Sequence, residues 1–465
     1  MDTEMARETY GETVLHPLGL IAVLLLVLFV LFSSRRKAIV PLFIAAAAIP
    51  MAQRIIILGA DFTMLRILIV AYFARVMIRG EFRSIGWNRL DTAMLLWSIC
   101  GTMVRFLTHG SLDVLVSRLG WSFDMLGIYF VGRFLIRSWS DVKFVGEALA
   151  VLSLPVAVLF AVEWATAYNM FSIFGGVPAE TVVRDGRLRC QGAFAHPILA
   201  GTFWAAALPL IWTLRKDKNF LMRLGTIGCL FIVAACSSST PVVSVLVALT
   251  GVALFPWRRH RTKMWVGFFA LLASLHVVMK APVWHLISRV DLIGGSTGYH
   301  RYQLIDAFVR NFSKWYLLGE PDPMSWGVWA MRDVTNVYVS TGLTGGLLTL
   351  IVLLLVLIFA FGNVGRVLKM SSIARSPKRQ WICWCIGVAI CVHAFTFLAA
   401  SYFGQMIVML YLELALASCV YVFARRDARK QRAKTRVLEA QRPRNEIVSE
   451  RPIPSQSGPG RIPVR

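Results

Sequence analysis

The segment RLRCQGAFAHPILAG, residues 187–201, places charged side chains between two long apolar stretches. Arg187 and Arg189 carry guanidinium groups, which are always charged and present a rigid fork of donors that suits phosphate or diphosphate oxygens. His196 stands before Pro197, and Pro favours the first turn of a helix, so we expect a helix from residue 197. The N-terminal end of a helix attracts anions. The segment therefore indicates an anion site.

A second group of such residues occurs in residues 281–334, the longest connection between apolar stretches. The apolar spacing predicts an amphipathic helix from Tyr299 to about Trp315, lying on the membrane surface or capping a cavity. His300 and Arg301 fall in its first turns. The N-terminal end of a helix carries a partial positive charge, so a positively charged Arg301 is unfavourable there on its own. This favours a bound anion near Arg301. Pairing of the loop arginines with nearby acidic residues or anionic lipid is the alternative.

The residues after this helix are suited to binding sugar. Trp326 and Trp329 precede Asp333 and Asn336, and aromatic faces stack on sugars while Asp and Asn bind hydroxyl groups. An aromatic belt at the membrane interface explains the tryptophans equally well.

General acid–base chemistry has three candidates in these loops. Asp333 is the clearest base, with a helix N-cap as the alternative role for it. His196 and His300 are further catalytic candidates, and a capping or packing role is the alternative for His196.

The helices that must position these residues have the length and apolar composition of membrane-spanning helices. Hydrophobic residues make up 57% of the 465 residues, and the mean hydropathy is +0.64. Apolar blocks have the length that crosses a bilayer as a helix. We predict an all-α polytopic membrane helix bundle of about 12–13 transmembrane helices with a long, partly helical outer loop. The predicted spans lie near 16–33, 38–58, 62–78, 91–108, 114–136, 145–166, 197–214, 220–236, 240–256, 264–280, 335–361, 381–400 and 404–424.

Positive charge alternates between the connections, and this predicts the orientation of the chain. Every second connection is rich in Lys and Arg, which places those connections and the C-terminus in the cytoplasm. Residues 1–424 then form the transmembrane domain, with loops 167–196 and 281–334 on the same outer face. We expect residues 425–465 to be a disordered basic tail, lying against anionic lipid or serving only as an anchor. Because the net charge of +24 lies mainly in connections and tail, no nucleic-acid partner is expected.

Motifs for nucleotides and metals are not recognisable in the sequence. No Walker motif, GxGxxG unit, zinc signature or nucleophile elbow occurs in a supporting context. The eight cysteines are scattered, mostly in apolar blocks. We therefore expect no metal site and no cofactor.

Taken in order, several short motifs resemble the bacterial O-antigen ligase and O-antigen polymerase superfamily over roughly residues 20–420. These motifs are Arg189-x-x-Gly192-x-Phe194-x-His196-Pro197 at the start of a span, the turn CSSSTP, the large outer loop with Arg301, LLG at 317–319, and Asn336 followed by a glycine-rich helix start up to Gly346.

The resemblance implies a membrane glycosyltransferase at the periplasmic face of the bacterial inner membrane that takes a glycan from an undecaprenyl-diphosphate carrier. It implies that Arg189 and Arg301 hold the diphosphate, with Arg187 beside them, and that no metal is required. Ligases of this superfamily carry a His after the large loop, where this sequence has RDVTN, including Asp333 and Asn336. This difference favours a polysaccharide polymerase of exopolysaccharide or O-antigen biosynthesis.

The sequence is also compatible with three other functions. A ligase would transfer finished glycan to lipid A core, in lipopolysaccharide biosynthesis, or to another acceptor. A lipid-linked glycan flippase or other transporter would line a central cavity with charges, and a structural membrane protein is a further alternative. A polymerase is expected to contact membrane lipids, a flippase and chain-length regulator proteins.

Overall fold

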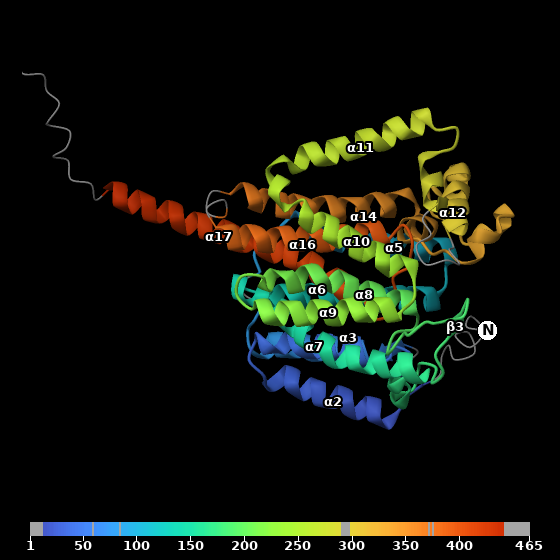
Figure 1. Cartoon of the computed structure of the whole chain (residues 1–465), viewed down its shortest axis with the longest axis horizontal. Coiled ribbons are helices and arrows are strands. Elements are labelled where there is room, and N and C mark those ends of the chain that lie inside the picture. Colours follow the sequence, from blue (N-terminus) through green and yellow to red (C-terminus); the bar gives the residue numbers. More distant parts are fainter. Residues whose placement is uncertain are drawn as a thin grey trace, which may run out of the picture.

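The computed structural model describes residues 13–57, 60–82, 85–289, 298–370, 373 and 376–440. These residues form a bundle of helices, and strands occur among them only in two short antiparallel hairpins (Figure 1). The predicted all-α polytopic membrane helix bundle is confirmed.

Most of the helices run along one common direction (Figure 1). The α-helices are α2 Pro17–Phe32, α3 Val40–Ala48, α4 Met64–Ile78, α5 Arg89–His109, α6 Leu112–Leu135, α7 Trp139–Thr166, α8 Pro197–Ile211, α9 Asn219–Ala235, α10 Ser239–Ala253, α11 Arg261–Val278, α12 Gly298–Arg310, α13 Phe312–Trp315, α14 Val337–Lys369, α16 Pro377–Thr396 and α17 Met406–Ala440. Short 3-10 helices are Lys37–Ile39, Met170–Phe174, Trp212–Leu214, Phe255–His260, Val283–Arg289, Pro323–Trp326 and Trp329–Arg332. One hairpin pairs β1 Arg54–Ile57 with β2 Ala60–Thr63, and the other pairs β3 Val183–Arg184 with β4 Arg187–Leu188.

Seven helices in the described part of the chain are long and apolar enough to cross a membrane. The bent pair formed by α10 and α11, with an angle of 75° at its break, raises this number to eight if it is one span. This measure gives fewer spans than the predicted 12–13, because α2, α9 and the helix over 37–48 are apolar but shorter than 18 residues, and α4 has only 15 residues.

The predicted span 38–58 is wrong in its second half. Helix α3 ends at Ala48, and β1 begins at Arg54. Pro50 disfavours a helical conformation at the residue before it. Gln53 and Arg54 follow as polar residues, so the chain leaves the helix and turns back as a hairpin.

The basic connections gather at one end of the bundle, here called the basic end. Arg35, after α2, lies 3.0 Å from Asp141 at the start of α7. Asp217, before α9, pairs with Lys143 of α7 and with Lys378 of α16, the latter at 2.7 Å. The alternation of charge along the sequence therefore corresponds to a real grouping in space.

The two predicted outer loops lie together at the opposite end, here called the loop end. Gln53, before β1, donates to the carbonyl of Phe174 in the first loop. Gln405, after α16, donates to the carbonyl of Ala193 in that loop at 2.6 Å. Ser401 donates to the carbonyl of Val334 in the second loop. Segments from four parts of the chain thus meet there.

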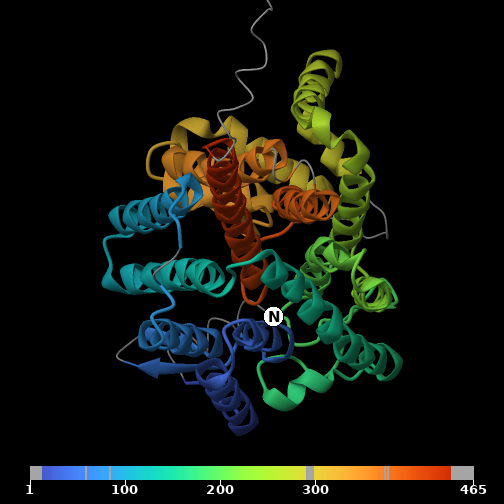
Figure 2. The same cartoon turned by 90° about the vertical axis from the view of Figure 1, so that its left-hand side faces the viewer.

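Helix α17 forms the centre of the bundle (Figure 2). Its first turns are buried continuously from Met406 to Val420, and α8 is almost as completely enclosed. Glycines permit close helix contacts here, since a Cβ at Gly201 of α8 would lie 2.7 Å from Pro241 of α10, and small residues are the usual means of close helix packing in membranes.

The predicted disorder of the C-terminal tail is wrong for residues 425–440. Helix α17 continues to Ala440 and projects beyond the other helices at the basic end (Figure 1). Arg, Lys, Gln and Ala are good helix formers, and no Gly or Pro interrupts them before Pro443. Residues 441–465 of the predicted tail lie outside the described residues.

The predicted amphipathic helix over 299–315 is present as α12 and the short α13, which cap the end of α14. Leu304, Phe308 and Trp315 pack with Val339 and Leu343 in one apolar cluster.

Helix α14 is broken at Gly346, where the cap inserts. Gly346 has φ of 67°, and the break leaves the amide of Leu347 to donate to the carbonyl of Tyr316 at 2.8 Å. The carbonyl of Leu343 accepts from the amide of Glu320, also at 2.8 Å. The LLG segment at 317–319 therefore lies in the notch of α14.

Candidate functional site

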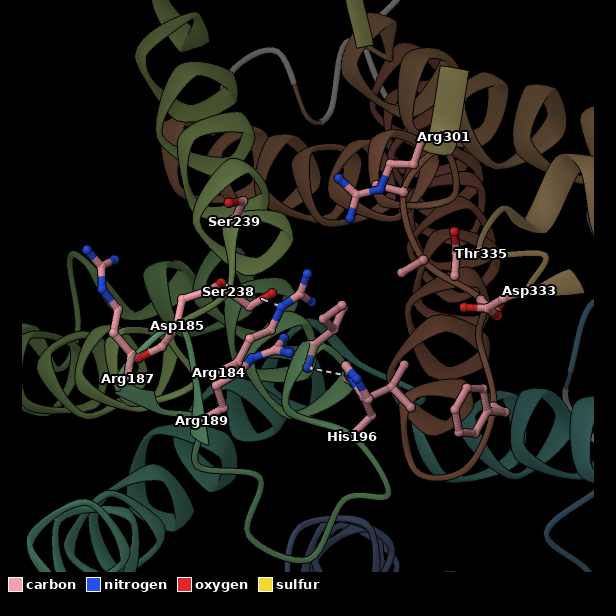
Figure 3. A pocket seen from close by; sticks show the side chains of 17 residues that line it. Arg184, Asp185, Arg187, Arg189, His196, Ser238, Ser239, Arg301, Asp333 and Thr335 are labelled. Atoms are coloured by element: carbon pink, nitrogen blue, oxygen red, sulfur yellow. Dashed lines mark hydrogen bonds and ion pairs between the residues drawn. The ribbon is translucent and has the colours of Figure 1, made fainter. Parts of the chain in front are cut away.

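A cavity of about 300 Å³ lies at the loop end (Figure 3). Its walls come from the 184–199 segment, the turn 237–239 between α9 and α10, the first turn of α12, residues 333–335 before α14, and residues 399–403 after α16. The sequence-predicted residues that line it are Arg187, Arg189, His196, Arg301 and Asp333.

The segment carrying Arg189 is held by a buried carboxylate. Glu163, near the end of α7, accepts hydrogen bonds from the amides of Gln191 at 2.9 Å and Gly192 at 3.0 Å. It also accepts one from the hydroxyl of Thr181 at 3.2 Å. Gly192 has φ of 56°, and a Cβ there would lie 2.5 Å from Phe160. The role of Glu163 as an anchor depends on contacts with a loop that is distant in sequence, which the sequence does not reveal.

Arg189 is buried, with 8% of its surface exposed. Its Nε atom is buried and makes no hydrogen bond. Burial lowers the pKa of Arg189, and the neighbouring Arg184 lowers it further. The local environment therefore penalises the positive charge that this side chain carries.

Arg301 is similarly enclosed on the other side of the cavity, with 7% of its surface exposed. Its Nη2 donates to the hydroxyl of Thr240, in the first turn of α10, at 3.0 Å. Its Nε is buried without a hydrogen bond, and burial lowers its pKa.

These two residues differ from the other buried arginines of the described chain. Arg75 lies 3.1 Å from Glu81, and Arg133 lies 2.9 Å from Asp91, so each of those charges has an acidic partner. Neither Arg189 nor Arg301 forms an ion pair among the described residues. Buried charges are normally paired, because an unpaired one is costly. Two uncompensated guanidinium groups on one cavity are therefore the arrangement expected of an anion site.

The two groups approach this cavity from different sides. Figure 3 shows Arg184, Arg189 and His196 along one wall, and Arg301 and Asp333 across from them. Arg187 lines the same cavity at its edge and is exposed, so its charge is solvated more than those of Arg189 and Arg301.

His196 is the N-cap of α8, as the predicted helix start at residue 197 requires. Its Nδ1 accepts from the amide of Ile198 at 3.1 Å. A neutral imidazole that accepts at Nδ1 carries its proton on Nε2. His196 is therefore equipped to donate a hydrogen bond to an anion, and it is poorly prepared to act as a general base.

Asp333 lines the cavity, and its side chain is exposed. His300 contacts the backbone carbonyl of Asp333 through Nε2 at 3.0 Å, and its ring meets the edge of Trp329 at 5.7 Å. His300 does not line the cavity. It is placed to position the backbone of Asp333, whereas the carboxylate of Asp333 itself faces the site.

The three residues predicted to bind glycan do not line the cavity. Asn336 is 1% exposed and is the N-cap of α14, accepting from the amide of Val339 and donating to the carbonyl of Leu398. Trp326 packs against the cluster beneath α12. Trp329 is 71% exposed on the outer surface. A sugar could reach Trp329, while the side chain of Asn336 is already committed to the fold.

Two parts of the site were missed in the sequence. Thr240 holds Arg301, and residues 397–405 form one wall and contact two others. The turn CSSSTP and the helix start at residue 240 were predicted from the sequence, but nothing in it pointed to a contact between Thr240 and Arg301. The 397–405 segment carries no charged residue, so nothing in its composition marked it.

No protein-family model matches the sequence, and no curated protein matches it either. Among the described residues there is no group of three or more His, Cys, Asp or Glu side chains that could hold a metal ion. What the geometry offers chemically is a cavity with two buried guanidinium groups, an imidazole donor and an opposing carboxylate.

Proposed function

We propose that this protein is a membrane glycosyltransferase that binds a diphosphate-linked glycan in the loop-end cavity. The observation that carries the proposal is the pair of buried arginines, Arg189 and Arg301, which have no acidic partner among the described residues and line one cavity. Their charges require a bound anion, and a diphosphate offers oxygens to two guanidinium forks at once.

The proposed reaction is polymerisation of undecaprenyl-diphosphate-linked repeat units at the periplasmic face of the bacterial inner membrane, with the C-terminus in the cytoplasm. Breaking the bond between sugar and diphosphate leaves negative charge on the leaving phosphate. Fixed, largely buried guanidinium groups stabilise that charge better than water does. His196, with its proton on Nε2, adds a further donor.

The acceptor sugar needs a group on the opposite side of the site. Asp333 is the candidate, because it lines the cavity across from Arg189 (Figure 3). Its carboxylate can orient the attacking hydroxyl and accept its proton as the new glycosidic bond forms. Attack from that side displaces the diphosphate in one step, so the anomeric configuration is inverted.

The distribution of charge supports an enzyme over a flippase. Of the buried arginines in the described chain, the two outside the cavity are paired with Glu81 and Asp91. Glu163 is occupied by three hydrogen bonds to the first loop. Among the buried arginines of the described chain, those without an acidic partner therefore lie together at one end of the bundle.

Deleting the gene and separating the glycans of the cell on a gel tests the proposed reaction. Loss of a polymerase leaves single repeat units attached to their final acceptor. Loss of a ligase leaves long polymer on the lipid carrier, and loss of a flippase leaves neither product. We expect the first pattern, and either of the others would replace the polymerase proposal.

Complementation with point variants tests the site. Arg189→Ala and Arg301→Ala should give the glycan pattern of the deletion while the protein still inserts into the membrane. Arg310→Ala is the matched control, because Arg310 belongs to the same helix as Arg301 but pairs with Asp306 at the surface. Polymer of normal length from both cavity variants would contradict the proposed site.

A further inference from the structure

A carboxylate, an imidazole and a hydroxyl lie in line beneath the cavity. Glu413 of α17 and His393 of α16 are both fully buried, and Oε2 of Glu413 lies 3.0 Å from Nε2 of His393. Neither oxygen of Glu413 forms a hydrogen bond with Nε2 of His393, although the two groups are this close. On its other side, Nδ1 of His393 lies 2.8 Å from the hydroxyl of Tyr402. An acceptor carboxylate beside Nε2 favours a proton there, so Nδ1 accepts from Tyr402.

Tyr402 belongs to the 397–405 segment, which joins the separate walls of the cavity. Ser401 donates to the carbonyl of Val334, next to Asp333. The carbonyl of Phe397 accepts from the amide of Val337 at 2.9 Å. Gln405 donates to the carbonyl of Ala193, in the segment that carries Arg189. The segment thus contacts the two sides of the cavity that must face each other.

The polar contacts continue to the side of Arg301. The hydroxyl of Thr396, in the last turn of α16, lies 2.9 Å from that of Ser244 in α10. Ser244 donates to the carbonyl of Thr240, whose hydroxyl holds Arg301. The end of α16 therefore touches the support of Arg301 as well as that of Asp333.

We propose that Glu413, His393 and Tyr402 are positioning residues that fix the 397–405 segment, and through it the placement of Asp333 opposite the two arginines. Tyr402 lies behind the cavity wall and does not touch the bound anion. The fixing of residues 397–405 by these three side chains does not depend on what the protein catalyses. Its effect on glycosyl transfer rests on the proposed function.

This role predicts a separation between binding and turnover. Arg189 and Arg301 each have a further support outside the 397–405 segment, Glu163 and Thr240, so we expect them to move less than Asp333 when the hydrogen bond of Tyr402 is removed. Asp333 depends on the 397–405 segment through its neighbours. A small displacement of a catalytic group lowers the rate of the chemical step strongly, so kcat should fall while donor KM stays nearly constant.

The central variant is Tyr402→Phe, and Tyr72→Phe is its matched control. Tyr72 is fully buried, and its hydroxyl makes one hydrogen bond to the carbonyl of Ala38, outside the loop-end cavity. With purified full-length protein and a lipid-diphosphate-linked repeat unit, we expect kcat to fall at least tenfold in Tyr402→Phe, with KM within twofold of the wild type. Equal kcat values in the two variants would overturn the proposal.

Conservative and disruptive changes at Glu413 separate positioning from general packing. Glu413→Gln keeps a polar oxygen beside Nε2 of His393 and should retain turnover within about threefold of wild type, whereas Glu413→Leu places an apolar group there and should behave like Tyr402→Phe. Wild-type turnover in Glu413→Leu would contradict the role given to this carboxylate.

Two further measurements keep this inference separate from the proposed reaction. Binding of inorganic pyrophosphate should be unchanged in Tyr402→Phe and weakened roughly tenfold to a hundredfold in Arg189→Ala. Hydrogen–deuterium exchange of residues 333–340 and 397–405 should accelerate in Tyr402→Phe and not in Tyr72→Phe. If the wild type transfers no glycan, the exchange result still decides the positioning role. Unchanged exchange in both segments would reject it.

Discussion

Arg189 and Arg301 line the same cavity from two different segments of the chain, and neither forms an ion pair among the described residues. Each has an Nε atom that is buried without a hydrogen bond. Arg75 and Arg133, which are as deeply buried, each have an acidic partner. The folded chain therefore contains two buried guanidinium groups that form no ion pair among the described residues, so a bound anion would offset the cost of burying them.

Removal of either cavity arginine should stabilise the ligand-free protein or leave its stability unchanged. Arg301→Met keeps much of the side-chain volume while it removes an uncompensated buried charge. We expect the Tm of the detergent-solubilised variant to equal or exceed that of the wild type. Arg75→Met is the control: it leaves Glu81 without its partner, and should lower the free energy of unfolding by about 3–5 kcal/mol. A comparable loss in Arg301→Met would show that Arg301 serves the fold.

Inorganic pyrophosphate should stabilise the wild type and not the arginine variants. A ligand that binds only the folded state at 100 times its Kd adds about 2.7 kcal/mol of stability. Loss of one charge-assisted hydrogen bond, worth about 1.5–3 kcal/mol, should weaken binding roughly tenfold to a hundredfold. Calorimetric titration of Arg189→Ala and Arg189→Lys checks this. Arg189→Lys should fall between alanine and wild type, because it keeps the charge but loses the fork.

Asp333→Asn should abolish turnover and leave pyrophosphate binding intact. The amide has nearly the size of the carboxylate but cannot accept the proton of the attacking hydroxyl. We expect a loss of kcat of about a hundredfold or more. His300→Ala should reduce kcat less, because it removes only a contact to the backbone carbonyl of Asp333. Full turnover in Asp333→Asn would exclude this residue as the base.

Glu163→Gln should loosen the segment that carries Arg189. The carboxylate accepts three hydrogen bonds, from the amides of Gln191 and Gly192 and from the hydroxyl of Thr181. The amide nitrogen of Gln cannot accept any of them. We expect a loss of about 1–3 kcal/mol in stability and faster hydrogen exchange at residues 189–192. Unchanged exchange in that segment would contradict the anchoring role.

The basic end should lose a small part of its stability in acid. Hydrogen bonds from Lys143 and Lys378 lower the pKa of Asp217 in the folded state. A depressed folded pKa adds stability above the unfolded value near 3.9, and this stability is lost as pH falls through the folded value. Because the pair is partly exposed, the contribution is below about 1 kcal/mol. Asp217→Asn should therefore be less stable than wild type at pH 7, and the difference should disappear as the pH falls through the lowered pKa of Asp217 in the folded state.

Much of the architecture could be predicted from apolar length and charge. The helix start at Pro197, the amphipathic helix containing Arg301 and the common end of the two long loops follow from local residue patterns. The hairpin over 54–63 was missed, because an apolar run of Ile residues fits a span and a strand equally well.

The candidate site was predictable in its charges but not in its supports. Arg189, Arg301 and Asp333 stand out by type and location. Whether an arginine has an acidic partner depends on tertiary contacts, and so does the capping role that occupies Asn336. The 397–405 segment could not be recognised, since its role rests on backbone carbonyls and on a buried Glu413 that is distant in sequence.

The notch at Gly346 fixes where the cap sits on the end of α14. A Cβ at this residue would lie 2.3 Å from the carbonyl oxygen of Leu317, so the two backbones meet with only a hydrogen atom between them. Partial withdrawal would strand the amide of Leu347 and the carbonyl of Leu343 in apolar surroundings, at a cost of about 1–3 kcal/mol for each. Both hydrogen bonds hold the cap in its seat, so the fold resists small displacements of the helix that carries Arg301.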